Sequence, residues 1–104
     1  MLIPVPENSD AKTCYNYALN ILGGERVPKK YEDIIKTNAW YSYWYAKDVI
    51  KDRFIEAEEV IRTKARYAYC YAKDILKDRW IEAEGVIKTD VEYWNKYKEH
   101  FNIC

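Results

Sequence analysis

The chain has 104 residues, of which 17 are basic and 17 are acidic, so its formal net charge at pH 7 is zero. This balance argues against binding through a one-sided basic field, as in many nucleic-acid-binding proteins, and against an acidic mimic of DNA. Hydrophobic residues make up 49% of the chain, which is too many for intrinsic disorder, and no apolar run approaches the ~18 residues of a membrane span.

The length fits one domain, residues 1–104, and its first helix is predicted at residues 11–22. Ser9 or Asp10 is a suitable N-cap, because a short polar side chain accepts a hydrogen bond from the first turn. The glycine pair at 23–24 predicts the end of this helix, since glycine adopts the left-handed conformation without strain.

Pro28 precedes the next predicted helix, residues 29–36, where its missing backbone N–H is tolerated. Later in the chain, Asp52 and Asp78 occupy the break that the glycine pair makes in the first segment. Because aspartate tolerates such turns moderately well, we expect these two residues to make the equivalent turns. The remaining helices are predicted at residues 39–51, 55–63, 65–77, 81–89 and 91–101.

An internal repeat organises the sequence. Residues 39–63 and residues 65–89 are identical at 17 of 25 positions, with an offset of 26 residues. A weaker copy is predicted at residues 11–37, and a half copy at residues 91–104. Each copy combines two short helices into a hairpin that cannot bury its apolar stripe alone, so neighbouring copies must stack. The sequence therefore predicts an all-α fold of short helical hairpins, stacked as a small α-solenoid or compact helical array.

Tyrosine dominates the aromatic residues: 11 Tyr and 4 Trp stand beside only 2 Phe, and many of these rings lie at the head of the first helix of each copy. Tyr43 recurs as Tyr69 and Tyr45 as Tyr71, so we interpret the repeated tyrosines as scaffold. Such a ring packs against a neighbouring helix while its hydroxyl reaches water or a backbone carbonyl.

A charged motif follows these rings, KDVIKDR at residues 47–53 and KDILKDR at residues 73–79. One interpretation is a solvated face with local pairing, and the other is polar contact between the copies. The arginine that ends each motif is suited to bond helix-end carbonyls, or Glu56 and Glu82.

The positions that differ between the two close copies are the candidates for binding. Trp40 is replaced by Arg66 and Trp44 by Cys70, and Glu59 also changes. Repeat proteins commonly keep the residues that hold the stack and vary those that face a partner, and Trp and Arg are enriched at interface hot spots. The alternative for Trp44 is that it fills space left by the irregular first copy. The predicted partner-binding residues are Trp40, Trp44, Glu59 and Arg66.

No motif of the sequence brings catalytic or metal-binding residues together. His100 is the only histidine and has no neighbour at metal-ligand spacing. Glu56 and Glu58 lie two positions apart on a short helix, so their carboxylates diverge by about 200° instead of converging on a substrate. We therefore expect no enzyme activity, no cofactor and no metal site.

The cysteines and the N-terminus favour a cytoplasmic protein. Cys14, Cys70 and Cys104 form an odd set without C-x-x-C spacing, which favours reduced thiols. Residues 1–6 have neither the basic n-region nor the apolar h-region of a signal peptide. Cys70 falls within a helical pattern, and we interpret it as a small buried hydrophobe.

The run YAKDVIKDRFIEAE at residues 45–58 resembles a helical repeat of small accessory proteins of tailed bacteriophages and large DNA viruses. The usual form of that repeat has Gly at the Asp52 position and Pro at the Ile55 position, so this chain departs from it there. The resemblance covers roughly residues 14–98. It implies a virus-encoded protein that acts in the cytoplasm of a bacterial host.

These observations together predict a non-catalytic protein-binding module that binds and blocks a host or defence protein, of the anti-restriction or anti-CRISPR type. One alternative is a nucleic-acid-binding module that stacks bases on Trp and Tyr rings and contacts phosphates through Lys and Arg. Another is a structural protein that assembles into homo-oligomers through the N-terminal arm Leu2–Val5 or the open ends of the stack. No membrane partner is expected.

Overall fold

The computed structural model describes residues 10–103, and every element of regular structure in that range is helical. The predicted all-α fold class is confirmed. The N-terminal arm Leu2–Val5, the candidate cap Ser9 and the thiol of Cys104 lie outside the described residues. Within residues 10–103 the α-helices are α1 (Ala11–Asn20), α2 (Lys29–Ile35), α3 (Ala39–Tyr45), α4 (Glu58–Ile61), α5 (Ala65–Tyr71), α6 (Ile81–Ile87) and α7 (Val91–Phe101). The shorter elements are the π-helical turns η1 (Ala46–Ile50) and η3 (Ala72–Leu76) and the 3₁₀ turn η2 (Ile55–Ala57).

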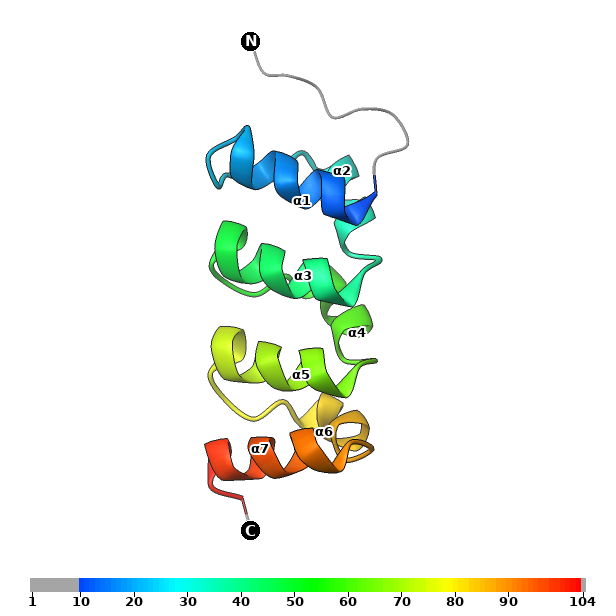
Figure 1. Cartoon of the computed structure of the whole chain (residues 1–104), viewed down its shortest axis with the longest axis vertical. Helices are drawn as coiled ribbons and strands as arrows, with labels where there is room; N and C mark the ends of the chain where they lie inside the picture. The colour runs from blue at the N-terminus through cyan, green and yellow to red at the C-terminus, as the bar shows by residue number, and fades with distance from the viewer. Residues whose placement is uncertain (1–9, 104) are drawn as a thin grey trace.

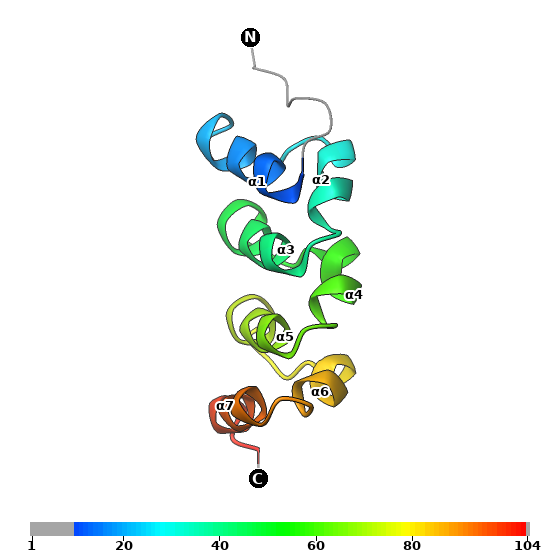
Figure 2. The ribbon, with the colours of Figure 1, turned by 45° about the vertical axis from the view of Figure 1, so that its right-hand side comes forward.

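The helices form two rows along one axis. α1, α3, α5 and α7 follow one another in the first row, and α2, α4 and α6 form the second row beside it (Figure 1, Figure 2). We call these the odd row and the even row. The principal dimensions are 54 × 22 × 19 Å, so the molecule is elongated. Each odd-row helix contacts the next one in its row, and the buried side chains form one continuous cluster.

Each predicted helix is present, with three differences in detail. The predicted helix 39–51 is divided into α3 and η1, and the predicted helix 65–77 into α5 and η3. The predicted helix 55–63 opens with the 3₁₀ turn η2. All three differences fall near helix ends, where the regular i to i+4 hydrogen bonding gives way to wider or tighter turns.

Both ends of α1 follow the prediction. Asp10 caps the N-terminus, where its Oδ1 accepts a hydrogen bond from the backbone N–H of Thr13 at 2.8 Å. After the helix, Gly23 (φ 66°) and Gly24 (φ 91°) adopt positive φ angles. The N–H of Gly24 donates to the carbonyl of Ala18 at 2.8 Å, which closes the end of the helix.

The turns after η1 and η3 differ from the prediction. The left-handed residues are Lys51 (φ 59°) and Lys77 (φ 56°), not Asp52 and Asp78, so the prediction is wrong by one position. The reason is the π-helical turn: the N–H of Lys51 donates to the carbonyl of Ala46 at 2.7 Å, and the lysine itself then reverses the chain. Each aspartate instead accepts a hydrogen bond from the backbone N–H of the arginine after it, at 2.7 Å.

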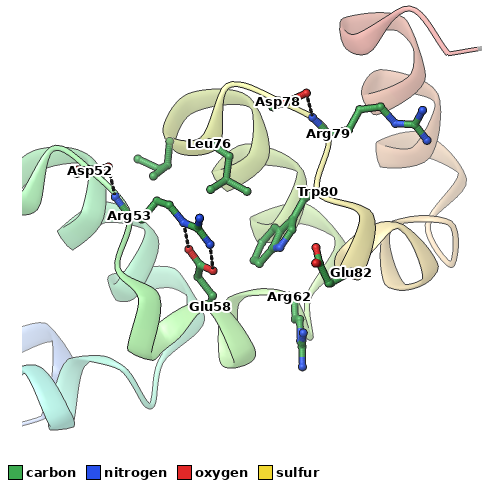
Figure 3. Close-up of a pocket in the computed structure, with 10 residues that line it drawn as sticks. Asp52, Arg53, Glu58, Arg62, Leu76, Asp78, Arg79, Trp80 and Glu82 are labelled. Carbon is green, nitrogen blue, oxygen red and sulfur yellow. Dashed lines mark hydrogen bonds and ion pairs between the residues drawn. The ribbon is translucent and has the colours of Figure 1, made fainter.

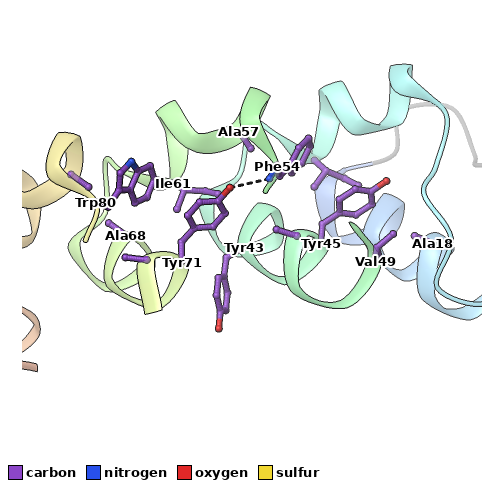
Figure 4. Packing of buried hydrophobic residues seen from close by; sticks show 14 of the residues in the cluster. Ala18, Tyr43, Tyr45, Val49, Phe54, Ala57, Ile61, Ala68, Tyr71 and Trp80 are labelled. Carbon is purple, nitrogen blue, oxygen red and sulfur yellow. Dashed lines mark hydrogen bonds between the residues drawn. The ribbon is translucent and has the colours of Figure 1, made fainter. Parts of the chain in front are cut away.

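A buried tyrosine at the end of α5 connects this helix to the segment before it. Tyr71 is 0% exposed, and its hydroxyl donates to Glu58 Oε2 at 2.6 Å. The same hydroxyl accepts a hydrogen bond from the backbone N–H of Phe54 at 2.9 Å (Figure 4). Arg53 donates two hydrogen bonds to the Glu58 carboxylate, both at 2.7 Å. We call this arrangement the Arg–Glu–Tyr cluster.

The Arg–Glu–Tyr cluster occurs three times within residues 10–103. The hydroxyl donates to glutamate at 2.6–2.7 Å and accepts from a backbone N–H at 2.8–3.0 Å. The tyrosines are therefore scaffold residues, although their partners are a glutamate and a backbone N–H rather than a carbonyl. The other two sets are Arg26, Val27, Glu32 and Tyr45, and Arg79, Trp80, Glu84 and Tyr97.

The predicted ion-pair partners of these arginines were Glu56 and Glu82, and the structure corrects this assignment. Arg53 pairs with Glu58, and Arg79 pairs with the equivalent glutamate of the next copy. Glu56 and Glu82 are both exposed at the start of their segments, whether the segment opens with the 3₁₀ turn η2 or directly with α6. Glu58, two positions later, lies within hydrogen-bond distance of the buried tyrosine hydroxyl.

Aromatic contacts connect one cluster with the next. The ring of Phe54 lies 5.3 Å from the ring of Tyr45, centroid to centroid, and Trp80 lies 5.0 Å from Tyr71 (Figure 4). The backbone N–H of Phe54 belongs to the second cluster, whereas its ring packs on the tyrosine of the first. Hydrogen bonding and apolar packing are therefore coupled along the two rows.

We expect Lys51→Gly to stabilise the protein, because a lysine in the left-handed conformation is strained by roughly 1 kcal/mol and a glycine is not. The free energy of unfolding, measured with urea, should rise by about 0.5–1 kcal/mol. Lys77→Gly should raise it by a similar amount. As a control, Lys47→Gly inside η1 should lower it by a similar amount. A Lys51→Gly variant less stable than the wild type would contradict the turn geometry.

Tyr71→Phe should lower the free energy of unfolding by about 1–3 kcal/mol, because it leaves the buried N–H of Phe54 without an acceptor. The matched control is Tyr67→Phe, since the half-buried Tyr67 contacts Trp40 through its ring and its hydroxyl makes no hydrogen bond within the described residues. The control should change the free energy by less than about 0.5 kcal/mol. Equal losses in the two variants would show that the cluster has no special role.

The protein should lose stability in acid through the glutamates of the clusters. Burial raises the pKa of Glu58, but hydrogen bonds from Arg53 and Tyr71 outweigh burial and hold this pKa below its ordinary value of 4.5. A carboxyl with a lower pKa in the folded chain stabilises the fold above the unfolded pKa, and this stabilisation is lost as the pH falls through the folded pKa.

Urea denaturation of Glu58→Gln tests this dependence. The difference in unfolding free energy between the wild type and Glu58→Gln should shrink as the pH is lowered from about 6 to about 3, because the wild-type carboxyl becomes neutral. As a control, Glu56→Gln changes an exposed carboxyl of the same segment. Its unfolding free energy should differ little from that of the wild type at both pH values. A Glu58→Gln difference that is independent of pH would refute the assignment.

Candidate functional site

Three of the four predicted partner-binding residues lie together on α3 and α5. The rings of Trp40 and Trp44 meet edge to face, with 5.5 Å between their centroids. The guanidinium of Arg66 lies 5.6 Å from the centre of the Trp40 ring, within cation–π range. The ammonium of Lys47 lies 5.0 Å from the Trp44 ring, and the Tyr67 ring lies 5.2 Å from Trp40. We call these five residues the aromatic–cationic patch.

Helix geometry explains why these side chains meet. Positions 40, 44 and 47 are separated by four and then three residues, so they project from the same side of α3 and η1. Arg66 and Tyr67 open α5, the next helix of the odd row (Figure 1). Both tryptophans are half-buried, whereas Lys47 and Arg66 are exposed. The patch therefore combines partly accessible rings with accessible positive charge.

The indole of Trp44 contains an unpaired polar group. Its Nε1 is buried and has no hydrogen-bond partner in the described part of the chain. An unpaired buried donor is unfavourable by about 1–3 kcal/mol, and native structures contain few such groups. Trp44 also packs against the buried cluster, which agrees with the alternative that it fills space. Space filling alone, however, requires no donor at this position.

Glu59, the fourth predicted residue, is not brought together with the other three. It is exposed on α4, which belongs to the even row (Figure 2). Within residues 10–103 its carboxylate makes no hydrogen bond or ion pair with another side chain. The aromatic–cationic patch is therefore built without it.

Two hydrogen bonds that the sequence did not predict connect neighbouring helices of the odd row. The hydroxyl of Tyr15 donates to Asp48 Oδ2 at 2.8 Å, and the hydroxyl of Tyr43 donates to Asp74 Oδ2. Burial and then the bond to aspartate raise the pKa of Tyr15 and Tyr43, so both remain neutral donors. The two aspartates belong to the charged motif, and for them the interpretation as contacts between copies is the right one.

A groove of about 560 Å³ lies between α5 and α7. Arg66 is part of its wall, so this α5–α7 groove is continuous with the aromatic–cationic patch. The wall carries three permanent cations against one carboxylate. Its charged and hydrogen-bonding side chains include Arg66, Tyr69, Lys73, Lys96, Glu99 and His100.

A second groove, of about 550 Å³, lies on the loop side between the second and third copies (Figure 3). Arg53 and Arg79 lie at its wall, and each is bound to the glutamate of its own Arg–Glu–Tyr cluster. These hydrogen bonds raise the pKa of both arginines. These two of the three arginines at its wall therefore belong to the scaffold, and the third is Arg62.

The described cysteines lie in environments that disfavour the thiolate. Burial raises the pKa of Cys14 and of Cys70, so both thiols are held in the protonated, weakly nucleophilic form. Cys14 is fully buried, whereas Cys70 is only partly buried. Within residues 10–103, no group of three His, Cys, Asp or Glu side chains is placed to hold a metal ion.

In the described range, each helix is too short or too polar to cross a membrane. The chain matches no protein-family model, and searches of curated proteins and of solved structures likewise give no match. Its function is therefore inferred from the aromatic–cationic patch and the α5–α7 groove.

Proposed function

We propose that this protein is a non-catalytic helical-repeat module that binds a protein partner through the aromatic–cationic patch. The observation that carries the proposal is the meeting of Trp40, Trp44 and Arg66 at positions where the two close copies differ. Contact between neighbouring helices does not require tryptophan there, because α5 has Arg66 and Cys70 at those positions and still contacts α7.

The geometry of the patch suits it to binding. Arg66 already lies over Trp40, and Lys47 over Trp44, so less side-chain freedom is lost when a partner binds. The exposed parts of the rings favour apolar or aromatic side chains of a partner, and the two cations favour carboxylates at the rim. Buried aromatic and arginine anchors of this kind commonly supply most of the affinity of an interface.

The proposed partner is a host or defence protein in the cytoplasm of a bacterial cell. In this proposal the chain is a phage-encoded accessory protein of the anti-restriction or anti-CRISPR type, which acts by covering a surface of its target. The resemblance of residues 45–58 to repeats of phage and large-virus proteins supports the origin. The 54 Å length of the molecule supports the mode of action, because a long rigid stack can cover a binding site on a larger protein.

Capture from a lysate of bacterial host cells should return one partner in stoichiometric amount. With that partner, Trp40→Ala and Arg66→Ala should each weaken the affinity at least about tenfold, as expected for hot-spot residues. The matched control is Arg62→Ala, an arginine next to α4 in the even row, which should leave the affinity unchanged. Circular dichroism of each variant separates loss of contact from loss of fold.

Absence of a stoichiometric partner, or full affinity in both patch variants, would contradict the proposal. A parallel titration with single-stranded DNA at low salt distinguishes the alternative function. Binding of DNA that weakens steeply as salt is added would favour the nucleic-acid-binding module.

A further inference from the structure

A carboxylate joins neighbouring helices of the odd row in its first two steps. In the step from α3 to α5, Asp74 accepts the hydrogen bond of the Tyr43 hydroxyl, and its carboxylate lies 4.0 Å from the ammonium of Lys47. In the step from α1 to α3, Asp48 accepts from the hydroxyl of Tyr15. The carboxylate thus satisfies a phenol of the preceding helix, half-buried in Tyr15 and buried in Tyr43, and in the second step it also lies near a lysine.

The last step, from α5 to α7, has no such carboxylate. The offset of 26 residues places Tyr69 and Lys73 where the preceding step has its tyrosine and lysine, but it places His100 where that step has Asp74. Unlike the equivalent tyrosines, Tyr69 makes no hydrogen bond through its hydroxyl within the described residues. The α5–α7 groove of about 560 Å³ lies at this position.

We propose that the α5–α7 groove binds an anionic group of the protein partner, the carboxylate or phosphate of an acidic or phosphorylated side chain. The anion takes the role that the Asp74 carboxylate has one copy earlier: it accepts from the Tyr69 hydroxyl and pairs with Lys73. This inference rests on the proposed protein-binding function and specifies the chemistry of the partner.

The charges of the groove favour an anion. Three permanent cations line it against one carboxylate, that of Glu99. The ion pairs of the lysines are weak: Lys73 lies 4.0 Å from Asp74, and Lys96 lies 3.7 Å from Glu92 in an exposed pair. Pairs as long as these contribute little net energy, so both ammonium groups can also pair with a better-placed anion.

Two tyrosine rings position these lysines. The ammonium of Lys73 lies 5.4 Å from the centre of the Tyr69 ring, and that of Lys96 lies 5.1 Å from the centre of the Tyr93 ring. The two rings contact each other across the α5–α7 step, with 6.0 Å between their centroids. Cations from both helices therefore lie beside the same pair of rings, where one anion can pair with both.

Titration of the ¹⁵N-labelled full chain with inorganic phosphate and, separately, with acetate tests the site. Saturable NMR shifts in the millimolar range, largest at Tyr69, Lys73 and His100, are expected with at least one of the two anions. Saturation by phosphate alone identifies a phosphorylated side chain as the source, and saturation by both identifies acidic side chains in general. Shifts that never saturate and that spread over lysines along the whole chain would overturn the proposal.

Two variants of α7 test whether the anion binds in the α5–α7 groove. His100→Asp supplies the carboxylate that the earlier steps contain, so it should weaken anion binding at least about tenfold and raise the melting temperature by a few degrees. Asn95→Asp adds the same charge at an exposed position that does not line the groove, and binding should stay within about twofold of the wild type. Equal binding by His100→Asp and the wild type would refute the site.

The reciprocal variant Asp74→His keeps the test decisive if His100→Asp does not fold. It removes the carboxylate of the α3–α5 step and should create new saturable shifts at Tyr43 and Lys47. These titrations need no partner protein, so their outcome is independent of the capture experiment. Saturation without a captured partner would refute the protein-binding function alone, and a captured partner without saturation would refute the anion site alone.

Discussion

The fold depends on a buried tyrosine hydroxyl that makes two hydrogen bonds at once, donating to a glutamate and accepting from a backbone N–H. A buried carboxylate is unfavourable unless it is paired, and the arginine at the rim of each cluster provides that pairing with two hydrogen bonds. The backbone N–H that donates to the tyrosine hydroxyl belongs to Phe54 or its equivalent, and the ring of that residue packs on the tyrosine of the previous cluster. Loss of one cluster therefore weakens the packing of the next, so the stability of neighbouring copies is coupled.

The composition of the chain follows from this unit. Each copy brings its own arginine and glutamate, so charges are balanced locally and the net charge of zero arises without separate acidic and basic halves. Part of the tyrosine excess has the same origin, because three of the 11 tyrosines, the fully buried Tyr45, Tyr71 and Tyr97, carry the hydroxyls of the clusters. Each row is only one helix deep. A tyrosine suits such a structure because its ring packs against apolar side chains while its hydroxyl hydrogen-bonds to polar groups.

The repeat and the helical periodicity were sufficient to predict the helices, because both depend on local spacing. They could not show that Arg53 binds Glu58, since that choice depends on which glutamate lies at the buried hydroxyl of Tyr71, a residue of the next copy. The left-handed Lys51 also escaped prediction, because a π-helical turn leaves no compositional signal. Of the site, Trp40 and Arg66 were predictable from the differences between copies. The hydrogen bond from Tyr43 to Asp74 could not be predicted, although each of these residues has an equivalent 26 residues away in the other close copy.

The proposed binding surfaces lie where the repetition is broken. Tryptophans at positions 40 and 44 break it on α3, and His100 breaks it on α7, where the second and third copies have aspartate. Both departures from the repeat lie on the odd row. Arg66 contacts Trp40 and also lines the α5–α7 groove beside His100, so a single partner can cover the aromatic–cationic patch and the groove. The even row repeats its exposed apolar residues, since Ile55 is 67% exposed and its equivalent 61%, and the change there from Glu59 to Gly85 removes a side chain without adding a ring or a cation. Features copied with the unit need no partner to explain them, whereas a substituted residue beside an unused phenol and weakly paired lysines favours one. The proposed direction of docking thus follows from the departures from the repeat.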